Sequence, residues 1–200
     1  MHDFLEKHKK FHQQYFRDEP ELYKTLQSGQ NPKALVIACS DSRADPALIT
    51  NAQPGDLFVV RNVANIVPSF AAKVHSVASA LEYGIQYLKI PDIIVLGHSQ
   101  CGGIKALLNN EVQSSNCIQD WIDHAKPAKA RTLKHSTPDT AQERCEQENI
   151  LLSLENLLSY PWIHARVTAK TLHLHGWHFN ITDGSLSHYR PDVAKFRRTF

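Results

Sequence analysis

The sequence predicts an α/β fold in which a mainly parallel central β-sheet is flanked by helices. Three short apolar runs, residues 34–38, 57–60 and 93–96, have the composition of strands that are buried on both faces. Segments with apolar residues at helical spacing separate these runs, and such alternation is typical of a parallel sheet. An Asp183-Gly184 hairpin signal predicts that residues 185–189 return as an antiparallel edge strand. We therefore expect about four parallel strands plus this edge strand.

Residues 4–26 are mostly polar, with apolar side chains recurring at helical spacing. Pro20 interrupts the pattern, so the segment predicts two helices rather than one. A narrow aromatic stripe on a charged helix buries little surface by itself. Two arrangements remain open: the helices wrap a partner subunit, or they pack back on their own domain. We define residues 1–28 as the N-terminal helical arm.

The remainder of the chain shows no internal repeat and no low-complexity linker, which predicts a single domain over residues 1–200. In chain order, the expected elements are a turn at 28–32, a strand at 34–38, a short helix at 46–49, a strand at 57–60, a long helix at 73–89, a strand at 93–96, a helix from 104, helices around Trp121, at 141–158 and after Pro161, and a strand at 171–177.

The composition excludes several classes of protein. A net charge of +2 with 21% charged residues lacks the basic character that is typical of nucleic-acid-binding domains. The longest apolar runs are far shorter than the roughly 18–20 residues that a membrane span needs, and the N-terminus has no apolar signal segment. Four cysteines in 200 residues do not make a disulfide scaffold. We therefore expect no nucleic-acid or membrane partner and a location in the reducing cytoplasm.

Soft metal ligands follow two of the predicted strands. Cys39 ends the strand at 34–38, and His98 and Cys101 follow the strand at 93–96. Ligands of open parallel sheets bind at the carboxyl ends of the strands, so these side chains meet if the two strands are neighbours. One imidazole and two thiolates form a ligand set of catalytic zinc sites, in which the fourth position is left for water or substrate. We expect one zinc ion per chain.

Asp41 and Arg43 form a second group, two residues beyond Cys39. The planar guanidinium of arginine matches a carboxylate, orients it and lowers its pKa. A carboxylate that cannot donate a proton accepts a hydrogen bond from a water bound to the metal. The spacing therefore predicts a catalytic pair beside the zinc site.

Three motifs give the chain a family resemblance. It resembles the β-class carbonic anhydrases from about Gln30 to Tyr189, with further similarity in segments such as Leu174-His175-Gly176-Trp177. The motifs are Cys39-Ser40-Asp41-Ser42-Arg43, Arg61-Asn62-Val63-Ala64-Asn65 and Gly97-His98-Ser99-Gln100-Cys101-Gly102-Gly103.

The resemblance implies reversible hydration of carbon dioxide to bicarbonate and a proton by zinc-bound hydroxide. It assigns the zinc to Cys39, His98 and Cys101, and catalysis to Asp41 and Arg43. It also implies a homodimer, or a dimer of dimers, as the active assembly. Substrate binding is assigned to Gln30 and Gly102, and to a pocket wall of Phe58, Val63 and Tyr83 that the neighbouring subunit supplies.

One departure defines a subgroup within this resemblance. Some bacterial members bind regulatory bicarbonate with a tryptophan three residues before the first zinc cysteine, where this sequence has Val36. Arg61 matches the arginine of that site, but it belongs to a motif shared by the whole family. We therefore expect a plant-like pocket without the regulatory site.

Two alternative functions keep the same ligands. The scaffold also hydrolyses carbon disulfide or carbonyl sulfide in close relatives, and a non-catalytic zinc-binding module would need a closed site with four ligands. A dinucleotide-binding role is weaker, because Gly102-Gly103 is not a Gly-x-Gly-x-x-Gly motif. A second metal site among His173, His175 and His178 is not favoured.

Overall fold

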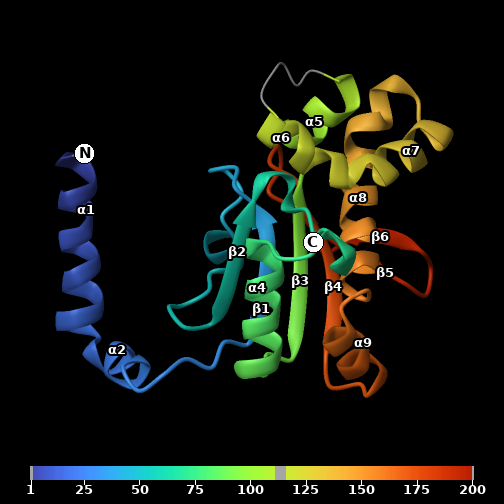
Figure 1. The fold of residues 1–200 in the computed structure, drawn as a ribbon. Helices are drawn as coiled ribbons and strands as arrows, with labels where there is room; N and C mark the ends of the chain where they lie inside the picture. Colours follow the sequence, from blue (N-terminus) through green and yellow to red (C-terminus); the bar gives the residue numbers. More distant parts are fainter. Residues whose placement is uncertain (1, 111–115, 200) are drawn as a thin grey trace.

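The computed structural model describes residues 2–110 and 116–199, and its centre is a six-stranded sheet in the order β2-β1-β3-β4-β5-β6 (Figure 1). The first four strands in this order run parallel, and β5 and β6 are antiparallel to their neighbours. The prediction of a mainly parallel sheet with an antiparallel strand near 185–189 is confirmed. The strands are β1 Ala34–Cys39, β2 Leu57–Asn62, β3 Asp92–His98, β4 His173–Phe179, β5 Leu186–Arg190 and β6 Lys195–Arg198.

The sequence did not predict β6. Its four residues, Lys195-Phe196-Arg197-Arg198, are mostly charged and give no apolar run. The strand nevertheless pairs with β5 at the edge of the sheet. Charged side chains on such an edge oppose pairing with further strands from other molecules.

Nine helices surround the sheet in the described part of the chain, with short 3₁₀ and π turns between them. Four of them begin at a proline. Proline fits the first position of a helix because the backbone N–H group there has no partner within the helix. The helices are α1 His2–Gln13, α2 Pro20–Leu26, α3 Pro46–Thr50, α4 Ser76–Glu82, α5 Gly102–Asn109, α6 Asn116–Ile122, α7 Lys126–His135, α8 Pro138–Leu157 and α9 Pro161–Thr168.

The long helix predicted at 73–89 is shorter and starts later. Lys73 has φ 63° and ψ −145°, backbone angles that an α-helix excludes. His75 instead caps α4, because its Nδ1 accepts the Ala78 N–H at 3.2 Å. Beyond Glu82 the helix continues as a π turn over Tyr83–Tyr87.

Two apolar layers cover the faces of the sheet. On one face the side chains of β1 and β3 pack with α4, α8 and α9. On the other face small and branched residues such as Val36 and Ile94 pack with Ile49 of α3. A third apolar cluster encloses the carboxyl ends of β1 and β3 and includes both Cys39 and Cys101. The core therefore leads directly to the predicted metal ligands.

The N-terminal arm contains its predicted helices, α1 and α2, joined by a π turn, and α1 stands to one side of the sheet (Figure 1). Its aromatic rings contact one another, with the Phe16 and Tyr23 centroids 4.7 Å apart. Phe4 and Leu5 remain 72% and 64% exposed. Within residues 2–110 and 116–199, no helix combines the length and apolar character that a membrane crossing requires.

Candidate active site

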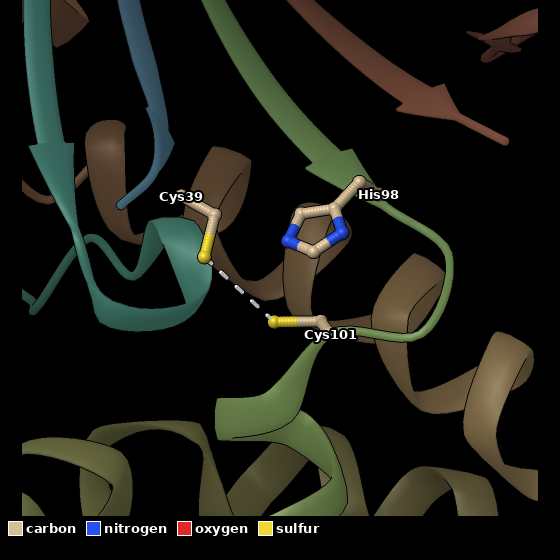
Figure 2. A group of neighbouring side chains, drawn as sticks. All are labelled: Cys39, His98 and Cys101. Carbon is tan, nitrogen blue, oxygen red and sulfur yellow. Dashed lines mark hydrogen bonds between the residues drawn. The ribbon is translucent and has the colours of Figure 1, made fainter. Parts of the chain in front are cut away.

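Cys39, His98 and Cys101 come together at the carboxyl edge of the sheet. Cys39 is the last residue of β1, His98 is the last residue of β3, and Cys101 precedes α5 (Figure 2). The strands are neighbours, with Ala38 paired to Leu96. The three side chains point toward one another, and their potential ligand atoms all lie within 4.8 Å of each other. All three residues are buried.

The donor atoms fit a tetrahedral metal ion. The two sulfurs are 3.9 Å apart, and two thiolates on one zinc would be separated by about 3.8 Å, given bonds of roughly 2.3 Å. The Nδ1 atom of His98 lies 2.9 Å from the Ser99 carbonyl oxygen, so the proton belongs on Nδ1 and the lone pair on Nε2. That buried Nε2 atom has no hydrogen-bond partner among the described residues. A buried atom of this kind calls for a partner, and a metal ion supplies one.

The two thiols influence each other strongly. A hydrogen bond from Cys101 lowers the pKa of Cys39 to about 4. The same contact, together with burial, raises the pKa of Cys101. Two buried sulfurs at 3.9 Å do not both carry negative charge unless a cation lies between them. The pair therefore favours a divalent ion, which allows both to bind as thiolates.

Asp41 and Arg43 form the predicted pair beside these ligands. Arg43 donates from Nε to Asp41 Oδ1 at 3.0 Å and from an NH2 group to Asp41 Oδ2 at 2.7 Å. These hydrogen bonds hold the pKa of Asp41 well below its usual range. Asp41 Oδ2 lies 4.0 Å from His98 Nε2. The carboxylate thus faces the metal site while its oxygens are held by the guanidinium.

Arg61 connects the metal ligand to this pair. Its Nε donates to the Cys39 carbonyl at 3.0 Å, and one NH2 group donates to the Asp41 carbonyl at 2.7 Å. The other NH2 group donates to Asp45 at 2.7 Å. The sequence marked Arg61 only as part of a motif, and nothing in its spacing identified Asp45 as its partner. The residue holds the backbone on both sides of the turn from β1.

The glycines after Cys101 have different surroundings. A Cβ on Gly103 would lie 2.8 Å from Val63 Cγ1 and 3.0 Å from the Cβ of Ala64, so the close approach of α5 to this turn requires glycine. Apart from its chain neighbours and the backbone of α5, no heavy atom of the described chain lies within 4 Å of the corresponding position on Gly102. Gly102 is exposed at the start of α5 and leaves space next to Cys101.

The predicted pocket residues divide into two groups. Val63 packs in the apolar cluster that contains Cys39 and Cys101, so it lies beside the ligands of its own chain. Phe58 pairs with Leu35, four residues before Cys39, which places it about 13 Å from that end of the strand. Tyr83 contacts Phe58, with ring centroids 6.0 Å apart.

Gln30 precedes β1 and is exposed, so it also lies toward the amino end of the sheet. The structure therefore does not bring Gln30, Phe58 and Tyr83 to the metal ligands of the same chain. That a neighbouring subunit brings Phe58 and Tyr83 to the site stays a prediction. Val63, expected in the same pocket wall, lies beside the ligands of its own chain.

A further set of residues behind Cys101 was not identified from the sequence. Glu146 accepts the Cys101 N–H at 3.0 Å, and Gln142 donates to the Cys101 carbonyl at 3.1 Å. His178, predicted without a specific role, has its Nε2 3.0 Å from Glu146. The only signal in the sequence is that residues 142 and 146 are four apart on one helix, which is common on any helix.

Known proteins share this fold and these motifs. A family model described as Carbonic anhydrase matches residues 34–186. The carbonic anhydrase of Synechocystis sp. is 40% identical over 94% of this chain and 71% of its own length. Beta carbonic anhydrase 5, chloroplastic, of Arabidopsis thaliana is 40% identical over 91% of this chain and 62% of its own length. The chain belongs to the β-carbonic anhydrase family.

Solved structures of the β-carbonic anhydrases agree with the fold. The β-carbonic anhydrase CcaA superposes with a TM-score of 0.94 at 38% identity, over 100% of this chain and 92% of that chain. One of two tetrameric β-carbonic anhydrases from Sordaria macrospora gives a TM-score of 0.83 at 28% identity, over 94% of this chain and 95% of that chain. Enzymes of this class use zinc, and the Cys39, His98 and Cys101 group is suited to hold it.

Proposed function

We propose that this protein catalyses the reversible hydration of carbon dioxide to bicarbonate and a proton. The observation that supports it most directly is the buried Cys39, His98 and Cys101 group, with its unpartnered His98 Nε2, next to a carboxylate held by arginine. When bound, zinc supplies the Lewis acidity that makes hydroxide available from water near neutral pH. The remaining tasks fall to residues of the chain.

Asp41 accepts a hydrogen bond from the attacking hydroxide and so directs the oxygen lone pair toward carbon dioxide. It does so as an anion, because the Arg43 hydrogen bonds keep its pKa low. Arg43 also keeps both carboxylate oxygens engaged, at 3.0 and 2.7 Å, and thereby keeps Asp41 from becoming a fourth ligand. An open fourth position is what separates a catalytic from a structural zinc site, and this argues against the non-catalytic alternative.

Carbon dioxide reaches this position from the side of Gly102, where the chain leaves space. Val63 provides an apolar surface next to the ligands, which suits an apolar substrate. The proton released in the reaction leaves to buffer.

The active assembly is a homodimer or a dimer of dimers, in which Gln30, Phe58 and Tyr83 complete the pocket of the neighbouring subunit. Two features support this. Tyr83 is 46% exposed on its own chain, and similar β-carbonic anhydrases from Sordaria macrospora are tetrameric. The N-terminal arm is the segment that contacts the partner, since Phe4 and Leu5 are exposed apolar side chains.

The proposed cellular location is the cytoplasm.

The proposed pocket is of the plant-like kind and has no regulatory bicarbonate site. Val36 is a buried aliphatic residue with 2% exposure and offers no polar group. The Arg61 guanidinium donates hydrogen bonds to the Cys39 and Asp41 carbonyls and to the Asp45 carboxylate, which hold it against its own chain. Hydration should therefore show no steep, cooperative inhibition by bicarbonate.

Stopped-flow hydration of carbon dioxide with a pH indicator tests the function. The protein should hold about one zinc per chain and hydrate rapidly between pH 7 and 9. The Cys101→Ser variant should lose most of its zinc and at least about 1000-fold of the activity, because a ligand is missing. Zinc-loaded protein that leaves carbon dioxide unchanged would refute the proposal, and carbon disulfide and carbonyl sulfide would then be assayed.

A further inference from the structure

Glu146 is an acidic side chain in the interior, with 1% of its surface exposed. A carboxyl group in such a place requires hydrogen-bond donors. One oxygen, Oε1, accepts the Cys101 N–H at 3.0 Å and the Gln142 side-chain amide at 2.7 Å. The other, Oε2, lies 3.0 Å from Nε2 of His178. The side chain therefore joins the loop after β3, helix α8 and strand β4.

One of these three contacts is with the metal-ligand loop itself, and the other two are with residues that contact or pair with that loop. Cys101 is the N-cap residue of α5, and its sulfur makes no cap hydrogen bond within the described chain because it faces the other ligands. Glu146 holds the N–H of this residue, and Gln142 donates to its carbonyl at 3.1 Å. His178 pairs with Gly97, the residue before His98. The same carboxyl group thus connects the surroundings of two ligands.

We infer that Glu146 is a positioning residue that fixes the backbone of Cys101 and so holds its sulfur where the metal ion binds. The inference rests on the proposed function only in that the site holds zinc. It parallels the role of Arg61, which holds the carbonyl of Cys39. Outer partners of metal ligands commonly change metal affinity by about 10- to 100-fold when removed.

Glu148 provides a matched control on the same helix. It too is a buried glutamate, with 6% exposure, but its partner is Arg144 at 2.7 Å. No contact with the ligand loop is found for it within the described residues. A Glu148→Ala variant therefore removes a buried carboxylate from α8 without touching Cys101.

The experiment measures the rate of zinc loss to a chelator, with thermal unfolding recorded for each variant. Glu146→Ala should lose zinc at least about 10-fold faster than wild type. Glu146→Gln should stay within about threefold of wild type, because its amide oxygen still accepts the Cys101 N–H. Glu148→Ala should retain wild-type zinc kinetics whatever its unfolding temperature. Should Glu146→Ala not fold, the half-buried Gln142→Ala carries the same test, with an expected loss about threefold faster than wild type.

Cobalt substitution gives a second readout that is independent of activity. The absorption bands of cobalt(II) bound to thiolates report the geometry of the site, and we expect them to change in Glu146→Ala and not in Glu148→Ala. Equal zinc loss in Glu146→Ala and Glu148→Ala, or failure of Glu146→Gln to restore retention, would overturn the inference. Because neither readout uses carbon dioxide, an inactive wild type would refute the proposed function and leave this result standing.

Discussion

The two ends of the parallel strands differ in how complete they are within one chain. At the carboxyl end, three ligands, the Asp41 pair and their supporting hydrogen bonds are all present, and the ligands are at most 5% exposed. At the amino end, Phe58 and Tyr83 lie beside Tyr87, which is 72% exposed, and Gln30 is exposed as well. The contrast teaches that metal binding is a property of the single chain, whereas the substrate pocket is shared between chains under the proposed function.

The difference has a physical origin. A metal ion needs several buried donors at fixed distances, which a sheet edge provides when neighbouring strands end together. A pocket for a small apolar molecule needs only a surface that excludes water. A second subunit can provide such a surface equally well. Exposed aromatic side chains at one end of a sheet are typical of such a surface.

The largest expected change is in the activity of mixed oligomers, which test whether the amino end of one chain completes the site at the carboxyl end of its partner. Gln30→Ala alone should lower activity by about 100-fold, the range for loss of one positioned donor, while the zinc content stays unchanged. Cys101→Ser alone should abolish activity. When the two variants are co-expressed with different tags and purified as mixed dimers, one site receives Gln30 from the Cys101→Ser chain and is wild type in both halves. Activity per mixed dimer should return to about half of the wild-type value.

A mixed dimer that stays as inactive as its parents would place Gln30 in the site of its own chain, and the comparison of the two ends would fail. Mixed dimers of two Gln30→Ala chains serve as the control for the tags. They contain no wild-type site and should remain at the level of the single variant.

Glycine replacements sharpen the description of the carboxyl end, with a smaller effect. Gly103→Ala places a methyl group 2.8 Å from Val63 Cγ1, and such overpacking should lower the free energy of unfolding by about 1–3 kcal/mol. Gly102→Ala faces open space and should leave stability unchanged or slightly higher. Urea unfolding of both variants measures the difference. Equal stabilities would show that α5 does not pack closely against the turn at Val63.

The sequence predicted the carboxyl end far better than the amino end. Cys39, His98 and Cys101 each end or follow an apolar strand, so their meeting followed from parallel topology once β1 and β3 were neighbours. Asp41 and Arg43 are two residues apart, and a local pair of this kind needs no knowledge of the fold. The roles of Gln30, Phe58 and Tyr83 came only from resemblance, because aromatic side chains on strands and helices are usually core residues.

Contacts between residues far apart in the sequence could not be predicted from it. Glu146 lies 45 positions from Cys101, and no periodicity links them. The strand β6 was missed because its charged residues carry no apolar pattern. The predicted start of α4 was wrong because Lys73 has a positive φ, although a helical pattern begins there. Each failure concerns backbone geometry or partner choice that depends on the packed structure.

The smallest effect concerns His75, whose helix α4 leads into Tyr83 at the amino end. Burial, with a smaller contribution from His124, holds the pKa of His75 below its usual 6.5. The unfolded chain therefore binds more protons than the folded chain in this range, so the contribution of His75 is present above pH 6.5 and is lost as the pH falls toward its folded pKa. His75→Asn keeps an N-cap acceptor for the Ala78 N–H and removes the titration. Urea unfolding at pH 7.5 and 5.5 should show a smaller loss of stability on acidification in the variant than in wild type. Identical losses would mean that protonation of His75 does not change the free energy of unfolding.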